Sequence, residues 1–141
     1  MTAVEAAKSI TDPRFKITHS AFSNLKEVCE SLGIEGKVDG ILMDIGVSSP
    51  QIDDPTRGFS FEKDGPLDMR MDQSAKLDAK TIVNTYSKQD LAYIFKVYGE
   101  ENFASKVASA IVREREKTPF ETTLQLSEFI KRVIGGKPTP K

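Results

Sequence analysis

The order of apolar and polar positions along the 141-residue chain predicts an α/β beginning followed by a helical remainder. Residues 14–19 alternate between apolar and polar side chains, which is typical of a short strand. Residues 38–46 are apolar on both faces at their centre, as in a parallel strand that is covered on both sides. Residues 20–33 carry apolar side chains at helical spacing, and residues 3–10 favour a further short helix. Strand, helix and strand form half of a doubly wound α/β unit.

A long polar loop and a series of helices follow the second predicted strand. Residues 47–75 are rich in Pro, Gly, Asp and Ser, and a loop of this length inside a compact domain usually has a function. Beyond it, apolar residues recur at intervals of three and four positions, and Asp78, Ser87 and Thr122 are suited to begin helices. The predicted helices cover residues 78–86, 87–99, 101–116 and 122–136.

Charge separates these parts of the chain, although the whole has a formal net charge of only −1. Residues 44–75 hold seven acidic and three basic side chains, a net charge of −4. Residues 76–141 hold twelve basic and eight acidic side chains, a net charge of +4. The positive part suits a polyanion, and a solvated helical surface explains it about as well. The candidate contacts to an RNA backbone are Lys106, Arg113, Arg115 and Lys117.

Composition excludes several kinds of site. A single cysteine, Cys29, excludes an internal disulfide and a cysteine-based metal cluster, and a single histidine, His19, leaves no multi-histidine zinc set. We interpret Cys29 as a core residue on an apolar helix face and His19 as a strand-end residue without chemistry. No apolar run approaches the length of a membrane span, and no signal-peptide pattern is present. We therefore expect no metal and a cytoplasmic protein, or one of an organellar matrix if the source is a eukaryote.

The segment MDIGVSSPQIDD, residues 43–54, places polar side chains at the end of the second predicted strand. In open α/β sheets, ligands bind beyond the carboxyl ends of the strands. Asp44 therefore fits either a ligand contact or a cap for the amides of the loop. Ser48 and Ser49 suit caps of the loop, and Pro50 suits a fixed loop path. Gln51 offers both a hydrogen-bond donor and an acceptor.

A second polar cluster follows within residues 64–72, where the alternating stretch DMRMD fits either an edge strand or the wall of a pocket. Arg57 and Arg70 are placed to pair with the acids of this cluster or to reach a phosphate, and we favour internal pairing. Met69 and Met71 fit a base pocket, but packing is the interpretation that we favour. The acids are Asp64, Asp68 and Asp72.

Residues 39–72, DGILMDIGVSSPQIDDPTRGFSFEKDGPLDMRMD, resemble a block peculiar to the bacterial small-subunit ribosomal RNA (cytosine-N4)-methyltransferases of the MraW or RsmH type. The flanking stretches THSAFSNL, YIFKVYGEENFASKVASAIVRERE and TTLQLSEFI are similar to that family as well. The resemblance implies a partial class I, Rossmann-like α/β methyltransferase core in residues 1–75. It also implies an α-helical insertion for substrate recognition in residues 76–141.

The same resemblance implies S-adenosyl-L-methionine as cofactor and N4-methylation of a cytidine in 16S ribosomal RNA of the small ribosomal subunit. It places Phe22 against the adenine of the cofactor and makes Asp44 and Gln51 polar contacts to it. Asp44 is also the candidate catalytic residue. The chain lacks the family's glycine-rich loop after the first strand and its ribose-binding acid after the second. A non-catalytic RNA- or ribosome-binding piece of such a protein is therefore the alternative function.

Overall fold

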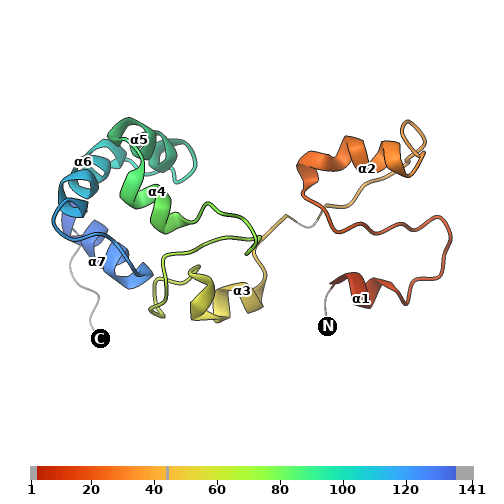
Figure 1. Cartoon of the computed structure of the whole chain (residues 1–141), viewed down its shortest axis with the longest axis horizontal. Coiled ribbons are helices and arrows are strands. Elements are labelled where there is room, and N and C mark those ends of the chain that lie inside the picture. Colours follow the sequence, from red (N-terminus) through yellow and green to blue (C-terminus); the bar gives the residue numbers. More distant parts are fainter. Residues whose placement is uncertain (1–2, 44, 136–141) are drawn as a thin grey trace. The chain divides into compact units, whose positions relative to one another are not determined.

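A computed structural model describes residues 3–43 and 45–135 of the chain, which divides into two compact units. The first unit is Met1–Gly46 and the second is Val47–Lys141. Figure 1 labels the helices of both units, and each unit is described by itself below.

The first unit holds short helices joined by extended loops. They are α1 (Ala3–Ala7), the 3-10 helix η1 (Phe22–Asn24) and α2 (Leu25–Ser31). The helix predicted at residues 20–33 is therefore confirmed in its central part. Leu25, Val28 and Cys29 on α2 are half-buried, and no side chain described within residues 4–43 and 45–46 is fully buried. Cys29 thus lies on the apolar helix face, as predicted, but not in a closed core.

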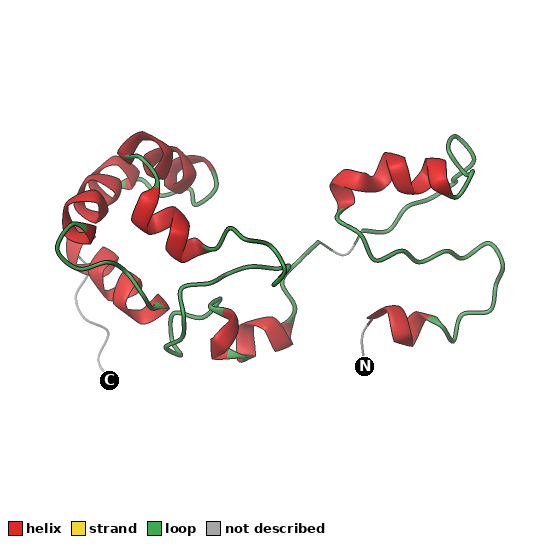
Figure 2. Cartoon of the chain, viewed as in Figure 1, coloured by secondary structure: helices red, strands yellow, loops and turns green. Residues whose placement is uncertain are grey.

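The two strands predicted at residues 14–19 and 38–46 are absent, and the described residues of the chain contain no strand at all (Figure 2). The prediction of an α/β architecture is therefore not confirmed by the structure. The physical reason lies in pairing, because a strand that is apolar on both faces needs neighbouring strands and covering helices. Without them, Ile41 is 54% exposed and Leu42 98% exposed.

The second unit is helical, and its helices begin where the sequence predicts them. Asp78, Ser87 and Thr122 each accept a hydrogen bond from the backbone N–H three residues on, which satisfies an amide left free in the first turn. The last helix ends at Gly135, whose φ of 82° favours glycine. The helices are α4 (Ala79–Thr85), α5 (Lys88–Val97), α6 (Ala104–Arg115) and α7 (Thr123–Ile134).

Short helices also interrupt the loop predicted at residues 47–75: α3 (Ser49–Asp53) and the 3-10 helix η2 (Pro55–Arg57). The sequence SPQ after Ser48 carries the signal for α3. Gln51 Oε1 accepts hydrogen bonds from the N–H and the Oγ of Ser48, at 2.8 and 3.1 Å. This is the reciprocal side-chain half of a capping box.

The core of the second unit lies where α6 packs against α4, α5 and α7 (Figure 1). Phe120, in the connection from α6 to α7, is fully buried, and its ring lies edge-on to Phe129 with 5.1 Å between centroids. The side chain of Asn84 donates to the carbonyl of Phe120 at 2.8 Å and accepts from its N–H at 2.9 Å. The buried apolar cluster consists of Leu67, Val83, Leu91, Val107, Ala108, Ile111 and Phe120.

Two leucines of opposite exposure test this assignment of the core. Leu91 is fully buried, so Leu91→Ala should lower the free energy of unfolding by about 3 kcal/mol, through lost burial and the cavity left behind. Leu42 is almost fully exposed, so Leu42→Ala should change it by less than about 0.5 kcal/mol. Urea unfolding followed by far-ultraviolet circular dichroism measures both. Equal effects would contradict the assignment.

Candidate functional site

The stretch Gly65–Asp68 runs between the first turns of α4 and α7 and is hydrogen-bonded to both. On one side, the N–H groups of Ala79 and Lys80 donate to the carbonyls of Asp68 and Leu67, each at 2.7 Å. On the other side, Leu67 N–H donates to the carbonyl of Glu121, and Thr123 N–H donates to the carbonyl of Gly65, each at 3.0 Å. A side-chain bond between Lys80 and Glu121 links the two helix starts directly. The loop is thus a fixed part of the helical unit.

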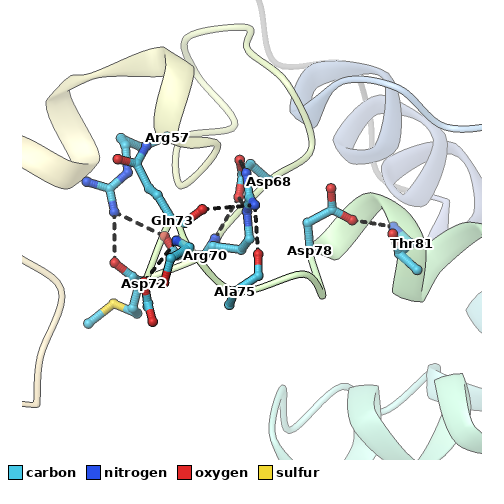
Figure 3. Close-up of polar contacts among 10 residues, drawn as sticks. Arg57, Asp68, Arg70, Asp72, Gln73, Ala75, Asp78 and Thr81 are labelled. Carbon is cyan, nitrogen blue, oxygen red and sulfur yellow. Dashed lines mark hydrogen bonds and ion pairs between the residues drawn. The ribbon is translucent and has the colours of Figure 1, made fainter. Parts of the chain in front are cut away.

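Arg70 organises the polar side of this loop (Figure 3). Its Nε and Nη2 donate to the two carboxylate oxygens of Asp68, at 2.7 and 2.8 Å, in the bidentate geometry that suits a guanidinium. Its Nη1 donates to the carbonyls of Gln73 and Ala75, at 3.2 and 2.8 Å. All of its side-chain nitrogens are therefore used internally. The prediction of internal pairing is confirmed for Arg70.

Arg57 is also used internally, and its hydrogen-bond partners are carbonyl groups of the loop. Its Nη2 donates to the carbonyls of Arg70 and Met71, at 3.0 and 3.2 Å (Figure 3). The Arg57 guanidinium lies 6.0 Å from the centre of the Phe59 ring, and its buried Nε has no hydrogen-bond partner among the described residues. The favoured internal use of Arg57 is therefore confirmed: its hydrogen bonds go to carbonyls of the loop, and its charge adds to the larger effect of the Arg70 hydrogen bonds in lowering the pKa of Asp68.

The acids of this region have defined structural roles. The bidentate bond from Arg70 lowers the pKa of Asp68 to about 2. The hydrogen bonds from Thr81 lower the pKa of Asp78, which caps α4 (Figure 3). Asp64 accepts from the N–H of Leu124 in the first turn of α7, at 3.3 Å. The carboxylates therefore hold helix starts and the loop in place.

A pocket of about 380 Å³ opens between the loop of residues 58–61 and one face of α7. Its lining is mainly apolar, and Met69 belongs to it. Met69 has a φ of 62°, an uncommon backbone conformation for a non-glycine residue, and its side chain is 51% exposed. Residues 68–72 thus form no edge strand, and of this stretch Met69 lines the pocket. The principal lining residues are Gly58, Phe61, Met69, Thr123, Leu126 and Lys131.

Two of the predicted cofactor contacts lie in separate units, and the third lies outside the described residues. Phe22 is 64% exposed in η1 of the first unit. Gln51 is half-buried in α3 of the second unit, where only its Oε1 takes part in the capping box. Asp44 falls in the gap between residues 43 and 45. The roles of these three residues stay predictions.

The basic residues singled out on α6 and just beyond it have different environments. Arg115 Nη1 donates to the carbonyls of Val83 and Tyr86, at 3.0 and 2.7 Å, so this guanidinium secures the end of α4. Lys106 is exposed, with its Nζ 5.9 Å from the centre of the Phe103 ring. Arg113 and Lys117 are exposed on the rim of a second hollow, of about 360 Å³.

One polar group of the larger pocket, the hydroxyl of Thr123, has no local signal in the sequence. Thr123 is only 7% exposed, and its buried Oγ1 has no hydrogen-bond partner among the described residues. Ser127 lies one turn further along α7 and lines the same pocket. Both belong to an ordinary amphipathic helix, and only the loop docked some sixty residues earlier in the chain makes a pocket over them.

The described residues provide no candidate metal site and no membrane-spanning helix. Within residues 3–43 and 45–135, no three His, Cys, Asp or Glu side chains are grouped so that they could hold a metal ion. In the same part of the chain, no helix has both the length and the apolar character to cross a membrane. His19 is exposed.

Comparison with known proteins identifies the class. The model of the MraW methylase family matches residues 1–141, so the chain belongs to this family. The resemblance read from the central block of the sequence is thereby confirmed. The family implies a methyltransferase fold, although the described residues hold only helices and loops.

Three curated relatives share a name. A protein of Idiomarina loihiensis, named ribosomal RNA small subunit methyltransferase H, is 53% identical over 132 residues, which are 94% of this chain and 42% of the relative. Proteins of Shewanella baltica and Shewanella frigidimarina with the same name are 49% identical over 136 residues, 96% of this chain and 44% of each relative. The chain spans less than half the length of these relatives.

The lowered pKa of Asp68 gives a test of the loop. Because the folded state binds this proton less readily than the unfolded chain, the stabilisation is complete above the unfolded pKa of about 4 and is lost as the pH falls toward 2. Between pH 5 and pH 2, the free energy of unfolding should decrease by about 1–2 kcal/mol through this group. In Asp68→Asn the decrease should be smaller by that amount.

Denaturant titrations at a series of pH values measure this difference. Asp39→Asn is the control, because Asp39 is exposed in the first unit. A wild-type pH dependence in Asp68→Asn would contradict the role given to the pair of Asp68 and Arg70.

Proposed function

We propose that the chain is part of an enzyme that transfers the methyl group of S-adenosyl-L-methionine to N4 of a cytidine in 16S ribosomal RNA. The observation that carries the proposal is the family match over residues 1–141, together with relatives about half identical that are named ribosomal RNA small subunit methyltransferase H. The substrate is then ribosomal RNA, free or in the small subunit, and the reaction belongs in the cytoplasm.

In this proposal, residues 1–75 are the part of a class I, Rossmann-like core that carries the cofactor and active-site loop, and residues 76–141 are a substrate-recognition insertion. The exposed apolar side chains of residues 41–47 support the first assignment, because neighbouring strands of an α/β sheet would cover them. The net charge of +4 over residues 76–141 supports the second, because it suits an RNA backbone.

The residues proposed to hold the cofactor have the chemistry that it requires. Phe22 offers an exposed aromatic face for the adenine. Gln51 uses only its Oε1 in the capping box, so its Nε2, which has no partner among the described residues, is available to donate to an oxygen of the cofactor. Asp44 is proposed to supply a second polar contact. When bound, S-adenosylmethionine supplies an electrophilic methyl group on a sulfonium.

The remaining task of the protein is to make the N4 amine reactive. The lone pair of that amine is delocalised into the cytosine ring, so the base has to leave the stack and the amine has to point in line with the methyl group. A carboxylate that accepts a hydrogen bond from the amine stabilises the positive charge that develops on N4. We assign this role to Asp44, in the loop that also contains Gln51.

An exchange of segments tests the proposal. The matching 132-residue stretch of the Idiomarina loihiensis protein would be replaced by this chain's sequence, and methyl transfer to small subunits lacking the modification would be measured. We expect N4-methylcytidine in the digested RNA, identified by mass spectrometry. A chimera that folds and binds subunits but transfers no methyl group would overturn the proposal.

Within this chimera, Asp44→Ala should lower the rate of methyl transfer by at least about 10²-fold, because the amine loses its acceptor. The thermal unfolding midpoint should stay unchanged. Glu35→Gln, which removes an exposed acid from a turn of the same unit, is the control and should retain the rate. Normal turnover of the Asp44 variant would refute its catalytic role.

The alternative is a piece that binds RNA without catalysis, and the same positive charge of residues 76–141 supports it. Calorimetry on the chain itself distinguishes this alternative from the proposed methyltransferase. Binding of S-adenosylmethionine at micromolar concentration supports a working cofactor site. Absence of that binding, together with RNA binding that weakens steeply with salt, supports the alternative.

A further inference from the structure

The pocket between the loop of residues 58–61 and α7 is not explained by the proposed cofactor contacts, since Phe22, Asp44 and Gln51 are not among its lining residues. Its volume of about 380 Å³ lies in the range of small-molecule pockets. The walls are firmly held, because Thr123 N–H is bonded to the carbonyl of Gly65 and Met69 N–H to the carbonyl of Arg57. Backbone hydrogen bonds therefore fix the positions of the pocket walls.

Thr123 indicates the kind of occupant. Its hydroxyl is buried among apolar groups with no partner among the described residues, and a buried hydroxyl left unpaired is destabilising. Ser127, on the same face of α7, adds a second hydroxyl to the lining. A purely aliphatic occupant would leave Thr123 unpaired. A flat ring with polar atoms on its edge would cover the apolar walls, and a change of the Thr123 rotamer would bring the covered hydroxyl to that edge.

The rim of the pocket adds a charge. Lys131 lines the pocket, and its Nζ lies 5.8 Å from the centre of the Phe61 ring, which is 59% exposed. An exposed aromatic ring beside an ammonium group suits a nucleotide, since the ring can contact the base and the ammonium can pair with the phosphate. The positive φ of Met69, which also lines the pocket, is a further feature typical of ligand sites.

We propose that this pocket binds one unstacked nucleotide of single-stranded RNA, with the base between Phe61, Met69 and Leu126, its polar edge at Thr123, and its phosphate at Lys131. The inference deepens the proposed function, on which it rests, by assigning an RNA contact that lies apart from the proposed cofactor and amine contacts.

Thr123→Val is the decisive variant, because it should change stability and RNA binding in opposite directions. Valine has nearly the shape of threonine and removes the unpaired hydroxyl, so the thermal unfolding midpoint of the full chain should rise. Loss of one hydrogen bond to the base should weaken binding of single-stranded RNA by about three- to tenfold. A merely structural role for Thr123 would not produce this combination.

The probes are pentamers of adenosine, cytidine or uridine ribonucleotides, titrated at low salt into the isotopically labelled full chain and followed by nuclear magnetic resonance. We expect shifts at the amides of Gly58, Phe61 and Thr123. Thr123→Ser, which keeps the hydroxyl, should retain most of the affinity. Thr118→Val, at an exposed threonine after α6, should change neither quantity.

Several results would overturn the inference. They are wild-type affinity in Thr123→Val, amide shifts confined to other surfaces, or no binding of any pentamer to the wild-type chain. Methyl transfer by the chimera described above is measured independently, so a failure of the pocket and a failure of the proposed function are distinguishable.

Discussion

The second unit depends on a short backbone segment, Gly65–Asp68, that is hydrogen-bonded on both sides to the starts of α4 and α7. Helix starts expose amides without partners inside the helix, and here a loop satisfies some of them. In return, the two helices bury Leu67 of the loop in their common core. The bidentate pair of Arg70 and Asp68 then directs the chain beyond the segment, because the Arg70 guanidinium gathers the carbonyls of Gln73 and Ala75. A loop rich in polar residues thus becomes an integral layer of the helical unit.

This arrangement separates structural polar groups from those free to meet a ligand. The acids at positions 64, 68 and 78 all bond to backbone amides or to Arg70, so their presence beside a pocket does not make them catalytic. Two polar groups without such a partner among the described residues are the Nε2 of Gln51 and the hydroxyl of Thr123. Such a division suits a protein that orients a flat polar substrate and leaves the reactive bond to a cofactor.

Periodicity was a good guide wherever helices carry their own signals. The spacing of apolar residues and the caps at Asp78, Ser87 and Thr122 predicted α4, α5 and α7 closely, because caps and amphipathic faces are local properties. The predicted strands depend instead on partners elsewhere in a sheet, which the described residues do not supply. The pocket could not be predicted either, since Phe61 and Thr123 meet only after the loop has docked on α7. The sequence also carries a local signal for α3, because Ser48 is suited to a cap and Gln51 follows it at the spacing of a capping box.

Two glycines of the docked loop, Gly58 and Gly65, limit the substitutions that this region tolerates. A Cβ at Gly65 would overlap the carbonyl of Pro55, and one at Gly58 would meet the carbonyl of Pro66 and lie 2.6 Å from the amide of Asp68. Gly58 also has a φ of 73°, in the left-handed region. Backbone here lies directly on backbone, with no side chain between the layers to yield. In a saturation mutagenesis map, both positions should therefore look like interior sites of a protein core, although neither contributes an apolar side chain and both belong to a loop.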